Sequence, residues 1–362
     1  ITAGGLADPL GDLAAPTHLK IEQYLPGDVL GGAHPAPRLS WEIASAPAGW
    51  APTGADLEIT RTDAAGTPLG EPEVLPLEVA DGVLAPWPAP PLASRDRVVL
   101  RVRVTGRSSE TPDAAAGTDS DAAGTTAEAD SPATASPADT GWSEPIAYEV
   151  GLLDPADWRA LPVGPSWPEN PLADRRPPRV RTEFDLPRPV VAARAYISAH
   201  GLIRAEIDGR RIGADELVPG WTVYGERLIA RTYDVTDLLT ASGDGTGAHA
   251  LGAQLADGWY RGHIGFDGGY RNLYGEDIAA VVQLEVTHDD GSRSLIATDA
   301  DWRAGVGEIL FTDLYDGEKV DARRAAPGWS RPGFDDSSWL PVEVGASDAE
   351  RLVMPTDAPV RA

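Results

Sequence analysis

Hydrophobic and polar residues alternate with a period of two along much of the chain, which is the pattern of half-buried β-strands. In the first half, residues 97–106 alternate arginine with leucine and valine, and residues 37–43 and 55–61 alternate in the same way. Residues 141–150 end this part of the chain with a further strand-like run. Short strands separated by loops rich in glycine, proline and alanine predict an antiparallel β-sandwich.

The second half shows the strand pattern more clearly. Residues 203–207 alternate isoleucine and alanine with charged residues, and an Asp-Gly pair at 208–209 follows, a dipeptide that hairpin turns prefer. Residues 251–255 and 282–286 alternate similarly, and a second Asp-Gly pair stands at 290–291. Because no amphipathic helix longer than two turns is visible, we predict a second antiparallel sandwich and an all-β chain.

The loops between these runs divide the chain into parts. We predict an N-terminal tail over residues 1–16, a first sandwich over 17–152, a second sandwich over 153–345 and a linker over 346–362. Within the first sandwich, residues 108–140 carry seven acids but no lysine, arginine, aromatic residue, valine, isoleucine or leucine. Such a segment cannot bury enough apolar surface to offset its ordering entropy, so we predict a disordered insertion there.

Composition and charge restrict the function. The 56 acidic residues against 30 basic ones give a formal net charge of -26 at pH 7, which disfavours binding to nucleic acid or to anionic membranes. No stretch approaches the ~18 apolar residues of a membrane-spanning helix. The absence of cysteine excludes disulfides, thiolate nucleophiles and thiolate metal sites, and it favours a cytoplasmic location.

One irregular segment, residues 257–275, combines six glycines with several large aromatic side chains. A loop of this composition can stack rings on apolar sugar faces while arginine, asparagine and aspartate bind hydroxyl groups. Internal packing is the alternative, and we expect it for Trp259 and Phe266. The better binding candidates carry groups that bind sugar hydroxyls: Arg261, Tyr270 and Asn272.

Patterns for catalysis or metal binding do not stand out. The six histidines are not at metal-ligand spacing, and no serine lies in a Gly-x-Ser-x-Gly context. Carboxylates are so numerous that a glycosidase-type pair cannot be selected from spacing. The residues by themselves therefore predict neither a catalytic residue nor a metal ligand, and we expect no cofactor. The alternative is a calcium site built from carboxylates and backbone carbonyls, which no EF-hand spacing supports.

A series of motifs runs through the chain in one order. In the second half they occupy residues 195–202, 206–213, 219–222, 232–239, 257–262, 272–275, 313–318 and 328–339. Together they resemble the N-terminal region of bacterial α-L-rhamnosidases. In the first half, residues 37–41 and 142–145 are similar to the fibronectin III-type domain that opens these enzymes. The resemblance covers about residues 17–362.

This resemblance implies a fibronectin III/immunoglobulin-like sandwich followed by a galactose-binding-like jelly roll. It also implies a longer glycoside hydrolase that removes terminal α-L-rhamnose, with inversion, from rhamnose-containing glycans or glycosides. In that family the catalytic acid and base lie on a downstream (α/α)6 barrel, so no catalytic residue is assigned here. The expected partner is that catalytic domain, toward which residues 346–362 would lead.

In some family members the jelly roll binds rhamnose together with calcium, through an acid–amide pair that follows a Pro-Gly-Trp-Thr motif. Val223 and Tyr224 occupy these positions here, and neither side chain offers a carboxylate. We therefore expect no bound metal and only weak saccharide binding. By resemblance and local chemistry, the carbohydrate-binding candidates are Trp221, Tyr224, Arg261, Asn272 and Tyr274.

Three functions stay open at this point. The two sandwiches could bind carbohydrate weakly, could serve only as a scaffold for the catalytic domain, or could form an adhesion or protein-binding module. A glycan titration separates the first function from the second. The third function requires an exposed apolar patch, which a sequence cannot reveal.

Overall fold

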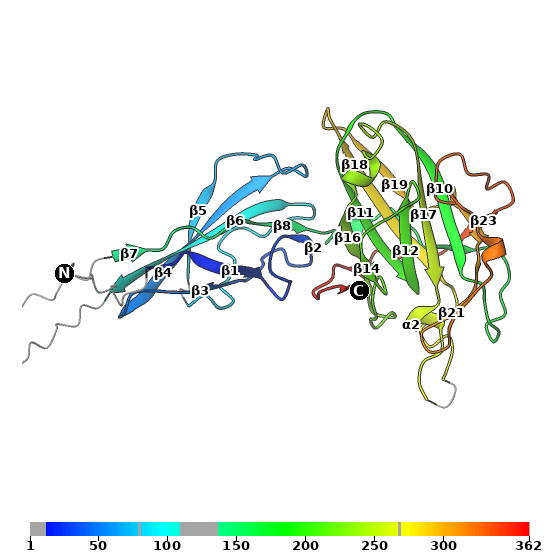
Figure 1. Cartoon of the computed structure of the whole chain (residues 1–362), viewed down its shortest axis with the longest axis horizontal. Helices are drawn as coiled ribbons and strands as arrows, with labels where there is room; N and C mark the ends of the chain where they lie inside the picture. Colours follow the sequence, from blue (N-terminus) through cyan, green and yellow to red (C-terminus); the bar gives the residue numbers. More distant parts are fainter. Residues whose placement is uncertain (1–11, 79–80, 109–136, 267–268, 362) are drawn as a thin grey trace, which may run out of the picture.

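Two β-rich lobes follow one another along the chain (Figure 1). The computed structural model describes residues 12–78, 81–108, 137–266 and 269–361. Apart from four short helical turns, the regular elements of these residues are β-strands, which confirms the predicted all-β class. Among the same residues, no helix is long and apolar enough to cross a membrane.

The first domain, the left lobe in Figure 1, is a sandwich of eight strands. These are β1 (Pro16–Ile21), β2 (Val29–Gly32), β3 (Leu39–Ile43), β4 (Trp50–Thr62), β5 (Glu73–Leu77), β6 (Arg97–Ser108), β7 (Pro137–Asp139) and β8 (Ile146–Val150). One sheet has the order β2-β8-β6-β4-β5 with β7 beside β6, and β1 pairs with β3 in the other layer. Both layers contribute to one core, which includes Ile21, Leu39, Leu57 and Leu100.

The alternating sequence of β6 explains how this domain is layered. Val98, Leu100, Val102 and Val104 are buried in the core. Arg101 and Arg103 lie between them and meet acids of β4. Arg101 Nη2 lies 2.6 Å from Glu58 Oε1, and Arg103 Nη2 lies 2.7 Å from Asp56 Oδ2. The polar positions of the pattern are therefore cross-strand ion pairs on the outer face of the sheet.

The second domain is a larger sandwich whose two faces join at one edge. Its main strands are β9 (Val163–Pro165), β10 (Pro178–Leu186), β11 (Val190–His200), β12 (Leu202–Ile207), β13 (Arg210–Arg211), β16 (Arg231–Asp234), β17 (Gly247–Ala256), β18 (Ala279–His288), β19 (Arg293–Ala297), β20 (Arg303–Val306) and β23 (Leu340–Val344). They follow the order β13-β12-β17-β10-β20-β23-β9-β18-β11-β16, with β19 beside β18. The core between the faces includes Ala195, Ile207, Leu251 and Val282.

The connections of the second domain carry the shorter elements. These are the 3-10 turns η1 (Pro155–Asp157) and η2 (Ala322–Arg324), the helical turns α1 (Thr236–Leu239) and α2 (Gly258–Arg261), and the hairpin of β21 (Ile309–Asp313) and β22 (Gly317–Val320). In Figure 1, α2 and β21 lie at the same lower end of the sandwich. We call this end the loop end.

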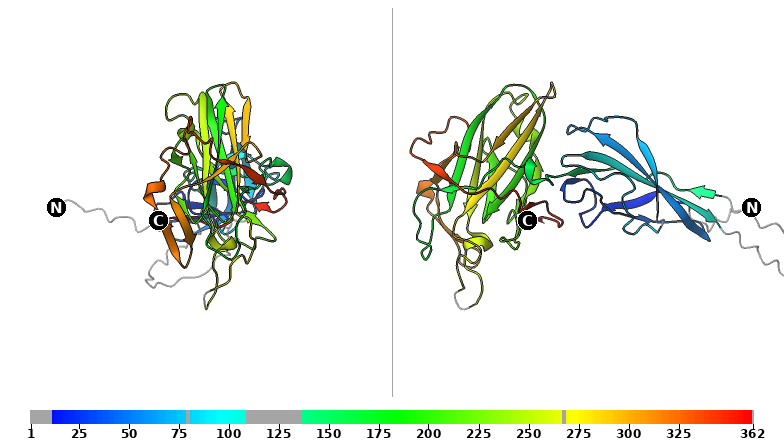
Figure 2. Two further views of the ribbon diagram at one scale, coloured as in Figure 1. Left: turned by 90° about the vertical axis from the view of Figure 1, so that its right-hand side faces the viewer. Right: turned by 180° about the vertical axis from the view of Figure 1, so that it is seen from behind.

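The structure differs from the prediction that residues 346–362 form a linker. Two short strand pairs anchor this segment to the second domain: β24 (Leu352–Val353) with β15 (Leu228–Ile229), and β25 (Val360–Arg361) with β14 (Asp215–Glu216). Leu352 and Met354 are buried, because they fill a hydrophobic cluster beside the sandwich. The Tyr24 hydroxyl of the first domain donates to the Pro355 carbonyl at 3.0 Å, so the segment also touches the domain junction (Figure 2).

Two other boundary predictions fall largely outside the described residues. Of the predicted tail, residues 1–11 lie outside them. Of the predicted disordered insertion over 108–140, residues 109–136 lie outside them. The end of that predicted insertion belongs to the sandwich instead, because β7 pairs with β6 and the buried Thr140 hydroxyl accepts the Val104 N–H at 2.9 Å.

Two arginines, the buried Arg194 and the half-buried Arg95, join the two domains. Arg194 on β11 donates from Nε and Nη2 to the two carboxylate oxygens of Glu149 on β8, at 2.7 and 2.9 Å. Its Nη2 also donates to the Ala64 carbonyl at 2.9 Å. Arg95, which precedes β6, donates to both carboxylate oxygens of Glu285 on β18 at 2.7 Å. Bidentate guanidinium–carboxylate pairs fix direction as well as distance, so these contacts define how the domains meet.

The variant Arg194→Ala should lower the free energy of unfolding by about 3 kcal/mol, because the buried Glu149 carboxylate loses its bidentate partner and keeps only Arg97, at 3.6 Å. Urea unfolding followed by tryptophan fluorescence measures the loss. Arg188→Ala is the matched control, since Arg188 is 45% exposed and pairs with Asp289 at the surface. Loss of that pair should cost less than about 1 kcal/mol. Equal losses in the two variants would contradict the role of the buried pair.

Candidate functional site

The segment over residues 257–275 connects β17 to β18 and carries much of the predicted site. It begins with α2 and then folds back on itself at the loop end. Close contacts require two of its glycines: a Cβ at Gly262 would lie 2.5 Å from the Gly258 carbonyl oxygen, and one at Gly275 would lie 2.1 Å from the Tyr260 hydroxyl oxygen. The glycines therefore serve close internal packing of the backbone.

Arg261 lies at the centre of this segment and is fully buried. Its Nε donates to Asp257 Oδ1 and its Nη1 donates to Glu169 Oε2, both at 2.6 Å. Its Nη1 also donates to the Glu276 carbonyl at 3.3 Å. With two carboxylates as partners and no exposed surface, the guanidinium holds separate segments together and cannot reach a ligand outside.

Asn272 is also engaged within the protein. Its Oδ1 accepts a hydrogen bond from Arg175 Nη2 at 2.6 Å, and its Nδ2 donates to the Pro171 carbonyl at 3.0 Å. Its backbone has φ of 62°, a left-handed conformation that asparagine tolerates better than most residues. Asn272 therefore fastens the segment that contains Pro171 and Arg175 to the loop.

The aromatic candidates form a second group. Tyr224 is 1% exposed, and its ring centroid lies 5.2 Å from that of Tyr260 and 5.0 Å from that of Tyr274. Burial raises the pKa of the Tyr224 hydroxyl. Trp221 is 53% exposed, and its Nε1 donates to the Tyr274 hydroxyl at 3.1 Å. Trp221 thus presents its ring to solvent, whereas Tyr224 offers no free ring face.

The five predicted site residues therefore do not form one site. Tyr274 contacts both Trp221 and Tyr224. Arg261 and Asn272 are linked instead through Arg175, whose Nη2 approaches both. Arg175 itself was not predicted. The sequence gives no signal for it, because its partners lie about a hundred positions farther along the chain.

Outside these two groups, the loop tip differs from the prediction. Phe266 is 94% exposed, so the expectation of internal packing is wrong for this residue. A bridge between Ile264 and Tyr270 pairs the two arms of the loop on either side of this part, so Phe266 lies beyond the paired residues. Tyr270 is 72% exposed, whereas Trp259 packs against a hydrophobic cluster of the second domain, as predicted.

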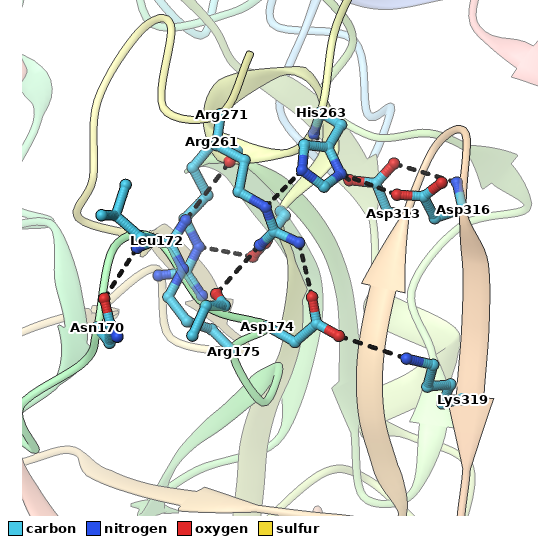
Figure 3. Close-up of polar contacts among 12 residues, drawn as sticks. Asn170, Leu172, Asp174, Arg175, Arg261, His263, Arg271, Asp313, Asp316 and Lys319 are labelled. Atoms are coloured by element: carbon cyan, nitrogen blue, oxygen red, sulfur yellow. Dashed lines mark hydrogen bonds and ion pairs between the residues drawn. The ribbon is translucent and has the colours of Figure 1, made fainter. Parts of the chain in front are cut away.

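A chain of polar contacts crosses the loop end (Figure 3). Lys319 Nζ lies 3.3 Å from Asp174, whose other carboxylate oxygen accepts from Arg271 Nη2 at 2.7 Å. Arg271 Nε donates to His263 Nε2 at 2.7 Å, and His263 Nδ1 lies 2.8 Å from Asp316 Oδ2. These contacts fasten the β21–β22 hairpin to the loop and to the segment before β10.

His263, Asp313 and Asp316 are the group of described residues whose side chains could hold a metal ion, since their ligand atoms lie within 4.8 Å of one another. Their hydrogen bonds argue for a different role. Because Arg271 donates to His263 Nε2, we assign the imidazole proton to Nδ1, which faces Asp316. The Asp313 oxygens accept the backbone N–H groups of His263 and Tyr315, at 2.7 and 2.9 Å. The group is thus satisfied by the protein itself.

Comparisons with known proteins agree with this β-rich fold and with the division of the chain into two domains. Residues 188–362 match the family model of the alpha-L-rhamnosidase N-terminal domain, and residues 16–119 match that of the Rha78A-like, N-terminal immunoglobulin domain. The solved α-L-rhamnosidase of Aspergillus terreus covers 96% of this chain with a TM-score of 0.80 and 34% sequence identity. The chain is built from the two N-terminal domains of the α-L-rhamnosidase family.

Relatives from bacteria extend this α-L-rhamnosidase assignment. The chain is 42% identical over 232 residues to an α-L-rhamnosidase of Streptomyces avermitilis. This match covers 62% of the present chain and 21% of the Streptomyces protein. It is 36% identical over 225 residues to an α-L-rhamnosidase of Alteromonas sp., of which 23% is covered. The match also spans 36% of the Aspergillus terreus chain. This chain therefore corresponds to between about a fifth and a third of these proteins.

The variant Arg261→Met should lower the free energy of unfolding by about 3–5 kcal/mol, since it leaves Asp257 and Glu169 without their common cation. Urea unfolding of the whole chain measures this loss. The control variant Trp221→Ala removes a half-exposed side chain of the predicted site and should cost less than about 1 kcal/mol. If Arg261→Met kept its stability, the structural role of this arginine would be wrong.

Proposed function

We propose that this chain is a structural platform of a longer α-L-rhamnosidase, and that it is neither the catalytic part nor a calcium-dependent rhamnose-binding module. The observation that carries this proposal is the burial of the predicted site. Arg261 and Tyr224 are closed off from solvent, and both polar ends of the Asn272 side chain bond to the protein. A platform needs such internal contacts, whereas a sugar site needs the same groups to be free.

The non-catalytic role is supported by length and by fold. The matched stretches span 21% and 23% of two relatives, and the regular elements of the described residues are almost entirely strands. The family resemblance implies that the catalytic acid and base lie on a helical barrel elsewhere in such a protein. Rhamnose-containing glycans or glycosides would then meet the longer protein at that barrel.

The platform would contact its catalytic domain through the loop end. Several apolar side chains are more than half exposed there: Phe266, Tyr270, Leu273 and Tyr315. They lie on two segments that the contacts of His263 hold together. Exposed apolar side chains gathered on a surface indicate an interaction site. An adhesion module would use such a surface as well, but the relatives favour contact within a rhamnosidase.

The residues at the expected metal site also indicate that the second domain does not depend on a metal ion. Val223 and Tyr224 bring no carboxylate to the position of the family's acid–amide pair, and Asn272 Oδ1 is occupied by Arg175. The carboxylates of the loop end are engaged by His263, by backbone N–H groups and by arginine. We therefore infer that the fold needs no calcium.

The purified chain should not release nitrophenol from 4-nitrophenyl α-L-rhamnopyranoside above the rate in buffer, because the helices of its described residues are single turns and cannot form the helical barrel. A full-length α-L-rhamnosidase assayed in parallel is the positive control. Turnover by this chain that disappears when one of its own carboxylates is replaced would overturn the proposal.

The melting temperature of the chain should be the same, within about 1 °C, in excess chelator and in 1 mM calcium chloride. A calcium site with a dissociation constant near 10 μM would add about 2.7 kcal/mol at that concentration, which corresponds to a shift of several degrees. Differential scanning calorimetry detects such a shift. Magnesium chloride at equal concentration controls for ionic strength, and stabilisation by calcium alone would refute metal-independence.

A further inference from the structure

A cleft of about 480 Å³ opens beside β9, where β11 and β23 end and β18 begins. Its volume is within the range of small-molecule sites, roughly 300–1,000 Å³. Trp167 and Tyr260 contribute aromatic surface to its wall. Residues 345–348, where β23 passes into the C-terminal segment, line another part of the wall. None of the five predicted site residues lines this cleft, so it is a separate feature of the second domain.

Arg175 in the wall of the cleft has an unusual environment. It is 5% exposed, yet no carboxylate of the described residues lies within ion-pair distance of it. Its Nη atoms donate to Asn272 Oδ1 and to the carbonyls of Arg261 and Glu276, but its Nε has no hydrogen-bond partner. Burial, together with the nearby Arg261 guanidinium, lowers the pKa of Arg175. The Nε atom itself is enclosed, but Arg175 lines the cleft, so its charge acts on whatever occupies the cleft.

Acidic groups surround this cation. Glu169 uses Oε2 to bind Arg261, while its Oε1 has no hydrogen-bond partner. Asp348 is bound by Arg351 and by His200, whose Nε2 lies 2.7 Å from Asp348 Oδ2. Burial alone would raise the pKa of Asp348, but these partners outweigh it and hold the pKa below its usual value. Within the described chain, three further acids of the wall have no ion-pair partner: Glu276, Asp277 and Glu343.

This mixture of groups selects the charge of a ligand. An anion would be repelled by the excess of carboxylates over the guanidinium groups of Arg175 and Arg351, whereas that excess does not by itself reject a cation. A neutral polyhydroxyl compound fits both kinds of group, because each hydroxyl can accept from a guanidinium and donate to a carboxylate.

The aromatic rings make a saccharide the best match among polyhydroxyl compounds. The Tyr260 ring stacks on His200 with centroids 5.1 Å apart and an interplanar angle of 23°, which fixes its orientation. Trp167 packs partly against the core, so its indole is also held in place. Rings fixed in this way can lie against the apolar C–H face of a sugar.

We propose that the cleft around Trp167, Tyr260 and Arg175 binds a neutral saccharide. This site lies apart from the predicted one around Trp221, and it goes beyond the platform role. Saccharide binding in the cleft is independent of the platform role, because the chain could support a catalytic domain whether or not a sugar is bound.

Saturation-transfer NMR of the whole chain tests the proposal with methyl glycosides of L-rhamnose, D-galactose and D-glucose. Glucuronic acid and glucosamine serve as charged probes of similar size. At least one neutral glycoside should bind with a dissociation constant on the order of 1 mM, and glucuronic acid should bind more weakly. Failure of every neutral glycoside to saturate would overturn the proposal, and stronger binding of glucosamine would identify a cation site instead.

Variants locate the binding to this cleft. Trp167→Ala and Asp277→Asn should each weaken the neutral glycoside about tenfold or more, while the matched controls Trp221→Ala and Asp301→Asn should leave it unchanged. Asp277 is exposed, so its variant keeps the fold even if Trp167→Ala does not. Binding that is lost with Trp221→Ala and kept in both cleft variants would place the sugar elsewhere and sink the inference.

Discussion

The structure depends on the need to match a buried guanidinium group with a carboxylate. Removing a charge from water is costly unless an opposite charge and further hydrogen bonds compensate for it. The buried Arg194 and Arg261 meet this need with Glu149 and Glu169, which lie 45 and 92 positions away in the sequence. The half-buried Arg95 pairs in the same way with Glu285, 190 positions away. These pairs decide which loops meet and how the two domains are joined.

The same need explains why a loop that looks suited to sugar binding is internal. Arginine, asparagine and tyrosine can bind hydroxyl groups of a ligand or polar groups of their own chain equally well. In the 257–275 segment, Arg261 lies inside the protein, where it finds two carboxylates, and Asn272 bonds to Arg175 and Pro171. Because these two side chains bond within the protein, they stabilise the fold and lose the freedom to recognise a ligand.

Arg175 is the informative exception, because it is buried without a carboxylate beside it. The cleft next to it depends on the C-terminal segment, whose Asp348 binds His200 and Arg351. That segment contains proline and charged residues and looks like a linker, yet Leu352 and Met354 anchor it by filling a hydrophobic cluster. A binding surface is thus completed by residues that local sequence would assign to a connection.

The alternation of apolar and polar residues was sufficient to predict the all-β class and two sandwiches, because side-chain burial in a strand follows a period of two. The ordered motifs were sufficient to predict the rhamnosidase resemblance. Neither signal could separate exposed Trp221 from buried Tyr224, three positions apart, or pair Arg261 with Glu169. The sequence by itself determined the strands and the family. Only the tertiary structure decided which polar and aromatic side chains are internal, because the burial of a side chain depends on distant segments that pack around it.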